Sequence, residues 1–172
     1  FRYLEIEGYK HDIAPADIER QTVHYPFNDF AVHFTSSDTV LNRVWELCRY
    51  SVKATSFAGI YVDGDRERIP YEADALLNQL CHYSVDREFT LARRSHEYLL
   101  NHATWPTEWI LQSVLIAWYD YLYTGDIRSA EANYSLLKHK TLSALEEEDG
   151  LIVVLNNPKV DSALRDSIRL PQ

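Results

Sequence analysis

The spacing of apolar residues changes near residue 36, and this change divides the chain into two parts. Before it, apolar and polar positions alternate in short runs, which predicts half-buried strands at 4–7, 21–25 and 29–34. Three strands are too few to form an independent sheet with a sizeable core. We therefore expect residues 1–34 to be the last strands of a β-domain.

After residue 36 the apolar positions recur at helical spacing. Asp38 or Ser37 can cap a helix whose apolar face begins at Val40, and further helices are expected at 71–83, 87–102, 108–123 and 127–147. A short strand is expected at 151–155, whereas residues 156–172 show little periodicity. Short connections between successive helices predict antiparallel hairpins. Five helices close no symmetric bundle, so residues 35–172 are expected to be a mainly α but incomplete domain.

Composition narrows the classes of function. The 172 residues are 46% hydrophobic and 13% aromatic, and the net charge is −9. A chain of this kind can bury a core, and its acidity argues against a nucleic-acid or anionic-membrane surface. Aromatic rings together with carboxylates suit a neutral polyol such as a sugar. The chain starts without Met and contains none, so we expect a piece of a longer polypeptide, whose compartment and oligomeric state are not indicated.

Cys48 and Cys81 lie inside apolar helical stretches, which predicts buried free thiols. Neither belongs to a CxxC or Cys/His cluster, and the seven histidines lack metal-ligand spacing. No metal or other cofactor is therefore expected.

The candidate chemistry is concentrated in residues 63–74, where five carboxylates and two arginines occupy twelve positions. The segment also contains Tyr71 and other apolar residues, which indicates partial burial. Buried charges have to be paired or functional. Glu67 and Asp74 are seven residues apart, so an early helix start would place both carboxylates on one face.

Paired carboxylates in a cleft are the groups that hydrolyse glycosides. One carboxyl group donates its proton to the departing oxygen, and the other activates water or attacks the sugar. Arg66 and Arg68 favour the ionised form of a neighbouring carboxylate, so an acidic Glu67 would need them to point elsewhere.

Trp105 and Trp109 flank Glu108 at the start of an expected helix. The two indoles would either pack in the core or form a platform on which a sugar ring stacks. Both interpretations remain open at this point.

The chain resembles the bacterial α-L-rhamnosidases of glycoside hydrolase family 78, which carry the pattern Asp-Cys-Pro-x-Arg-Glu-Arg-Leu-Gly-Trp-x-Gly-Asp. Here the Arg66-Glu67-Arg68 core matches outright, and Asp74 keeps the family spacing of seven from the glutamate. The segments 1–9 and 34–45 resemble the end of the preceding β-sandwich and the entry to the first catalytic helix. The resemblance spans roughly residues 1 to 150 of the chain.

This resemblance implies roles for individual residues. Glu67 would be the general acid, Asp63, Arg66 and Asp74 would hold sugar hydroxyls, and Tyr71 would replace the family tryptophan as a stacking ring. The family aspartate lies five residues before the glutamate, where this chain has Val62, so Asp63 matches after a one-residue deletion. Glu72 and Ala73 replace a less bulky pair.

The implied fold is part of an (α/α)6 barrel preceded by the last strands of a β-sandwich. The implied activity is inverting release of α-L-rhamnose from a rhamnose-containing carbohydrate, with the general base on a second glutamate outside this sequence. Two alternatives remain. One is a non-catalytic carbohydrate-binding protein on the same scaffold, and the other is a six-hairpin glycosidase for another sugar.

Overall fold

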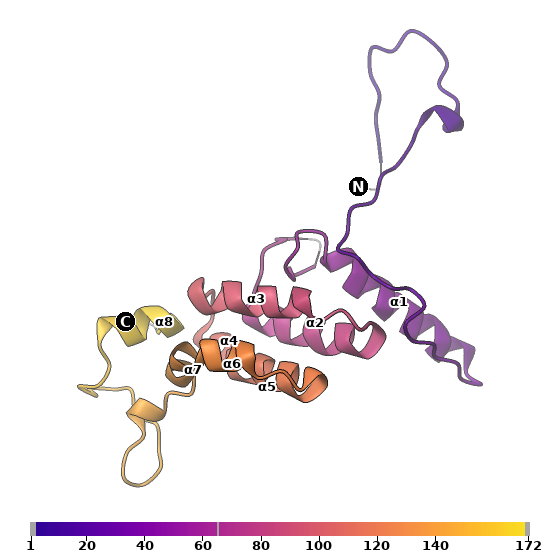
Figure 1. Ribbon diagram of the computed structural model, residues 1–172. Helices are drawn as coiled ribbons and strands as arrows, with labels where there is room; N and C mark the ends of the chain where they lie inside the picture. The colour runs from indigo at the N-terminus through magenta and orange to yellow at the C-terminus, as the bar shows by residue number, and fades with distance from the viewer. Residues whose placement is uncertain (1–2, 65, 171–172) are drawn as a thin grey trace.

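The computed structural model describes residues 3–64 and 66–170, so Phe1 and Arg2 of the segment that resembles the end of a β-sandwich and Asp65 of the charged loop lie outside the described residues. The chain is mainly helical, with the helices gathered in one body and the N-terminal segment projecting from it (Figure 1). The α-helices are α1 (Thr39–Thr55), α2 (Glu72–Val85), α3 (Thr90–Asn101), α4 (Thr107–Ile110), α5 (Ser113–Thr124), α6 (Arg128–Ala132), α7 (Tyr134–Lys140) and α8 (Ser162–Ile168).

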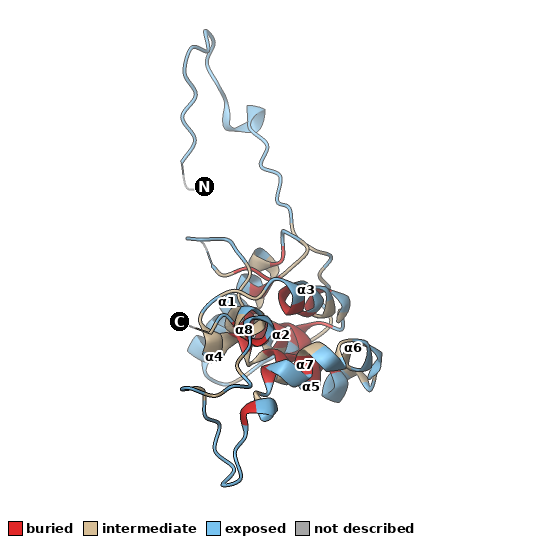
Figure 2. Cartoon of the chain, turned by 90° about the vertical axis from the view of Figure 1, so that its left-hand side faces the viewer, coloured by how far each residue is buried: buried red, intermediate tan, exposed pale blue. Residues whose placement is uncertain are grey.

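The N-terminal segment forms none of the three expected strands within its described residues. One short 3-10 helix (η1, Pro15–Asp17) interrupts a chain that is mostly exposed up to residue 24 (Figure 2). A strand requires a neighbouring strand to pair its backbone groups, and no strand lies beside this segment in the described part of the chain. Its assignment to a β-sandwich stays a prediction.

The segment joins the helical body at residues 25–30. The Tyr25 hydroxyl lies 3.0 Å from Thr90 Oγ1, and the Asn28 backbone N–H donates to Asp86 Oδ2 at 3.0 Å. Asp29 accepts from Arg49 and Lys53 of α1 at 2.8 and 2.6 Å. These contacts attach the chain to α1 and to the loop between α2 and α3.

The main core lies between α2, α3 and α5, where the buried positions concentrate in Figure 2. The apolar residues of α2 and α3 face each other, and Ile116 of α5 closes the cluster. The buried members are Tyr61, Ala75, Leu76, Tyr83, Leu91, Ala92, Leu99 and Ile116. Burial of such side chains stabilises the fold by roughly 1.5–3 kcal/mol for each large residue.

A buried carboxylate connects the same three helices. Asp120 of α5 accepts a hydrogen bond from the Tyr83 hydroxyl of α2 at 2.7 Å and from Arg93 Nε of α3 at 2.8 Å. Arg93 also donates to Asp126 and Thr124 at the end of α5. Asp120 is nearly fully buried, so these partners compensate a charge that would otherwise oppose folding.

Two of the expected helices are each divided in the structure. The helix expected at 108–123 is α4 followed by α5, and the helix expected at 127–147 is α6 followed by α7, which ends at Lys140. Asn133, between α6 and α7, bonds through its side chain to Ser129 O at 2.9 Å. Local bonds of this type compete with the regular helical ladder. Gly125 ends α5 at a φ of 69°, as the sequence indicated.

The end of the chain also differs from expectation. The strand expected at 151–155 is reduced to a single bridge between Glu146 and Ile152, the one isolated bridge among the described residues. The segment without periodicity contains α8, whose N-cap Asp161 accepts from Leu164 N at 2.8 Å. Leu145, Leu164 and Ile168 form a small buried cluster beneath α8.

Cys48 and Cys81 are free thiols, but the expectation that they are buried is wrong, because both are exposed. The apolar residues of α1 extend around its outer side, where Val40, Val44 and Leu47 are exposed as well. The apolar residues near Cys48 in the sequence are therefore exposed rather than buried. No helix among the described residues is both long and apolar enough to cross a bilayer.

Replacement of Asp120 should destabilise the whole helical body. Asp120→Ala leaves the Tyr83 hydroxyl and one arm of Arg93 without a buried acceptor, which should lower the unfolding free energy by about 2–4 kcal/mol. Urea denaturation followed by circular dichroism measures the loss. Glu131→Ala, at an exposed position of α6, is the control, and equal stability of the two variants would contradict the assigned role.

Candidate active site

The charged loop begins on a rigid base. Tyr61 and Val62 are almost completely buried. The Tyr61 backbone N–H donates to Ser95 Oγ of α3 at 2.8 Å, and its hydroxyl lies 2.6 Å from His82 Nδ1 of α2. The chain therefore leaves the core at a fixed point immediately before Asp63.

The loop closes on itself through Asp63 and Ile69. The Asp63 N–H donates to Ile69 O, and the Ile69 N–H donates to Asp63 Oδ1, both at 2.9 Å. Arg68 has a φ of 58°, in the left-handed region that reverses the chain before this contact. The closed loop presents Arg66 and Glu67 beside the start of α2.

The burial of Val62 bears on the shifted aspartate. The family position five residues before the glutamate falls on Val62, which packs in the core, whereas Asp63 faces the cleft described below. Of these two neighbouring residues, Asp63 is therefore the one whose side chain lines the cleft.

An aromatic wall faces the loop. Tyr71, the residue before α2, contacts Trp109 of α4 edge to face, with 5.9 Å between the ring centroids. The ring centroids of Trp105 and Trp109 are 6.4 Å apart, and Trp105 is 70% exposed. Of the two interpretations of the indoles, core packing does not describe Trp105.

The structure brings all seven sequence-predicted site residues to one cleft of about 240 Å³. Its lining consists of three carboxylates, one guanidinium and three aromatic rings. The residues are Asp63, Arg66, Glu67, Tyr71, Asp74, Trp105 and Trp109. Their individual roles remain predictions, but their juxtaposition joins segments about forty residues apart in the chain.

Glu67 and Arg66 form an ion pair at the mouth of the cleft, with Arg66 Nη2 donating to Glu67 Oε1. Arg66 is 87% exposed, so solvent weakens this pair and either side chain can leave it at low cost. A general acid donates its proton to the leaving group, but Glu67 is already bonded to Arg66 in this ion pair. Acid catalysis by Glu67 therefore requires Arg66 to take another partner, such as a sugar hydroxyl.

Asp74, in the first turn of α2, has the opposite environment. Partial burial raises the pKa of its carboxyl group, and the negative charges of Asp63 and Glu67 raise it further. Burial, followed by the charges of Glu67 and Asp63, likewise raises the pKa of the Tyr71 hydroxyl. Among the carboxyl groups of the cleft, Asp74 is thus the one whose surroundings favour the protonated form.

Glu72 and Thr104 belong to the structure of the site, although the sequence did not mark them as site residues. Glu72 is fully buried behind the cleft and accepts hydrogen bonds from Thr104, which precedes Trp105. The one signal in the sequence was that Glu72 and Ala73 replace a less bulky pair of the family pattern. No group of His, Cys, Asp and Glu among the described residues has the geometry of a metal site.

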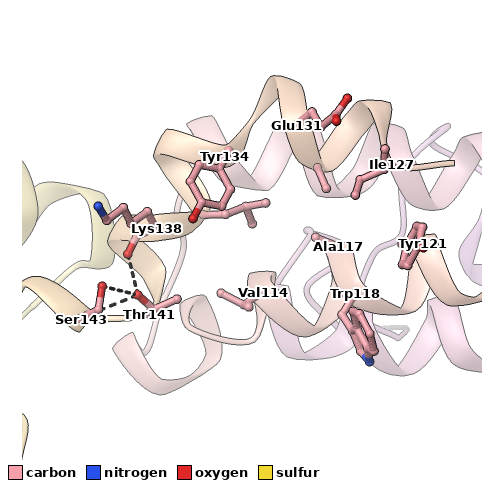
Figure 3. Close-up of a pocket in the computed structure, with 12 residues that line it drawn as sticks. Val114, Ala117, Trp118, Tyr121, Ile127, Glu131, Tyr134, Lys138, Thr141 and Ser143 are labelled. Carbon is pink, nitrogen blue, oxygen red and sulfur yellow. Dashed lines mark hydrogen bonds between the residues drawn. The ribbon is translucent and has the colours of Figure 1, made fainter. Parts of the chain in front are cut away.

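A second and larger groove, of about 890 Å³, lies between α5 and the pair α6–α7 (Figure 3). Its walls are mainly apolar and include Trp118, Tyr121 and Tyr134, with Thr141 and Ser143 at one end (Figure 3). Glu131 is its one carboxylate, so it lacks the paired acids of the cleft.

Comparison with known families places the cleft in context. The family model described as the bacterial alpha-L-rhamnosidase six-hairpin glycosidase domain matches residues 29–157. The chain belongs to this family. No curated protein and no solved structure gives a significant match.

The matched part of this six-hairpin glycosidase domain contains the whole cleft, from Asp63 to Trp109, together with α1 to α7. The mainly helical fold agrees with a domain built from helical hairpins. Segments before residue 29, including η1, lie outside the match.

The environment of Asp74 predicts a pH-dependent stability. Because its pKa is raised in the folded glycosidase domain, stability falls as pH rises from about 3.9, the usual value of an aspartate, through the raised value. Asp74→Asn removes this loss. The variant should therefore melt at a higher temperature than wild type at pH 7, and the difference should shrink towards pH 4.

Thermal melts at several pH values measure this effect. Asp166→Asn, at an exposed position of α8, is the matched control and should follow wild type throughout. An Asp74→Asn variant that melts below wild type at pH 7 would contradict the assigned environment.

Proposed function

We propose that this chain is the acid-bearing part of an inverting glycoside hydrolase that releases terminal α-L-rhamnose from glycosides or polysaccharides, as in glycoside hydrolase family 78. One observation carries the proposal. A single cleft within the glycosidase match holds a glutamate, two further carboxylates, an arginine and three rings.

Glu67 is assigned as the general acid. It transfers its proton to the glycosidic oxygen as the bond between that oxygen and the anomeric carbon breaks, so the leaving group departs as an alcohol. Release of Arg66 to a sugar hydroxyl frees Glu67 for this step.

The remaining cleft residues are assigned to the sugar. Asp63, Asp74 and Arg66 supply charged hydrogen-bond partners for its hydroxyls, which are stronger than neutral partners. Rhamnose is a 6-deoxy sugar, and its methyl group prefers an apolar surface to a polar one. Tyr71, Trp105 and Trp109 provide that surface.

Inversion requires a general base on the opposite face of the sugar, roughly 6.5–9.5 Å from the acid, with space for a water molecule between them. The base removes one proton from this water while its oxygen attacks the anomeric carbon. We assign this role to a second glutamate outside the present sequence.

Glu67→Gln is the direct test of the acid. In the intact enzyme this change should lower kcat for an alkyl α-L-rhamnoside by about 10²–10⁴-fold, because the amide cannot donate the proton. The rate should fall less for an aryl rhamnoside with an acidic leaving group, which needs less protonation. Near-normal rates on both substrates would refute the assignment, and circular dichroism verifies the fold.

Trp105→Ala tests the stacking platform. Loss of the indole should raise the dissociation constant for L-rhamnose about tenfold, which corresponds to about 1.4 kcal/mol. Isothermal titration calorimetry measures this change. Trp118→Ala is the matched control, because Trp118 is also an exposed indole, at 53%, but lines the other groove. If both variants weaken rhamnose binding equally, Trp105 is not a specific stacking platform for the sugar.

The two alternatives lead to different outcomes of these assays. Rhamnose binding without turnover by the intact protein would favour a non-catalytic carbohydrate-binding protein, in which Glu67 stays paired with Arg66. Turnover of another member of a panel of aryl glycosides, in preference to the rhamnoside, would favour a glycosidase for a different sugar.

A further inference from the structure

We propose that Glu72 is a positioning residue, which holds the indole-bearing segment 104–109 against the start of α2 so that the cleft keeps its shape. Its consequence for sugar binding rests on the function proposed above. The inference starts from a buried carboxylate beside the cleft that the acid chemistry does not use.

Glu72 is the first residue of α2 and none of its side chain is exposed. Its Oε1 accepts the backbone N–H of Thr104 at 3.1 Å, and its Oε2 accepts the Thr104 hydroxyl. Both carboxylate oxygens are thus bonded to one residue, thirty-two positions away in the chain. A buried charge with two matched donors fixes its partner more strongly than a neutral acceptor would.

Glu72 and its neighbour Tyr71 hold two different points of the same segment. Glu72 holds Thr104, which immediately precedes Trp105, while Tyr71 contacts the ring of Trp109. Trp105 and Trp109 also contact each other. The loop that carries Glu67 and the segment that carries the indoles are therefore joined through two consecutive residues.

The far side of the segment is attached to the end of the chain. Arg169 Nε donates to Ala103 O at 3.2 Å, and Thr107 Oγ1 donates to Arg169 O at 3.0 Å. Lys140 is buried nearby and donates to Ser167 O. Burial lowers the pKa of its ammonium group, while the charge of Glu72 acts in the opposite direction.

Glu72 has a role that other residues at this position would not fill. Glutamine has one acceptor oxygen and no charge, and its NH₂ group can only donate to the Thr104 hydroxyl, so the two charge-assisted bonds are replaced by weaker neutral ones. Thr104→Val removes the hydroxyl but keeps the backbone N–H, whereas Thr104→Ser keeps both donors. These three variants separate the hydrogen bonds from the size of the side chains.

Amide hydrogen exchange tests the contact without any substrate. Glu72→Gln and Thr104→Val should speed exchange in residues 103–105 at least tenfold, while Thr104→Ser stays within twofold of wild type. Glu88→Gln is the matched control, because Glu88 also accepts the N–H and hydroxyl of a threonine, Thr90, but at the start of α3. Its effect should be confined to α3.

Sugar binding tests the functional consequence. Glu72→Gln and Thr104→Val should weaken L-rhamnose binding about tenfold and, in the intact enzyme, raise KM with kcat nearly unchanged. Glu67→Gln should instead lower kcat. Thr104→Ser should keep wild-type affinity, because it keeps both donors. A general loss of stability on substitution of Thr104 would not explain this difference between serine and valine. Unchanged exchange, or faster exchange with unchanged rhamnose affinity and KM, would overturn the positioning role.

If the wild-type protein binds no rhamnose, the proposed function is refuted but the positioning role of Glu72 is not. In that case, acrylamide quenching of Trp105 and Trp109 fluorescence, with Trp45 and Trp118 replaced by phenylalanine, decides the inference. Increased quenching in Glu72→Gln but not in Glu88→Gln would support it, and equal quenching in both would overturn it.

Discussion

The arrangement of the helices depends on one buried carboxylate. Asp120 joins α5 to Tyr83 of α2 and to Arg93 of α3, and the apolar core surrounds these polar contacts. A hydrophobic surface alone tolerates sliding of one helix along another, whereas a bridged charge has one favourable register. That register holds α2 in place, and the start of α2 carries two residues of the cleft, with Asp74 in its first turn and Tyr71 immediately before it.

The parts of the molecule that could be predicted from sequence rest on local signals. Apolar spacing located α1, α2 and α3 closely, and Gly125 marked the end of α5. The cleft was predictable because its carboxylates, arginine and Tyr71 lie within twelve consecutive positions. Trp105 and Trp109 could be named as candidates from their place beside Glu108 at the start of an expected helix, but their contact with the loop is a tertiary one.

The parts that could not be predicted depend on contacts that spacing does not encode. The turn at Asn133 arises from a side-chain bond to the backbone, and α8 forms over a small apolar cluster assembled from distant residues. Cys48 and Cys81 lie in apolar stretches but are themselves exposed, even though α2, which carries Cys81, packs in the core. The buried Glu72 was inconspicuous because its partner, Thr104, is thirty-two residues away.

The charged loop has two ends of very different character. Tyr61 and Val62 are locked between α2 and α3, whereas Arg66 projects into solvent only a few residues later. A substitution at the base disturbs the core, whereas one at the tip changes the charge and shape of an exposed surface while the core remains intact. Mutational tolerance therefore changes sharply along a single short segment. The side chains at the tip can vary without any compensating change in the scaffold.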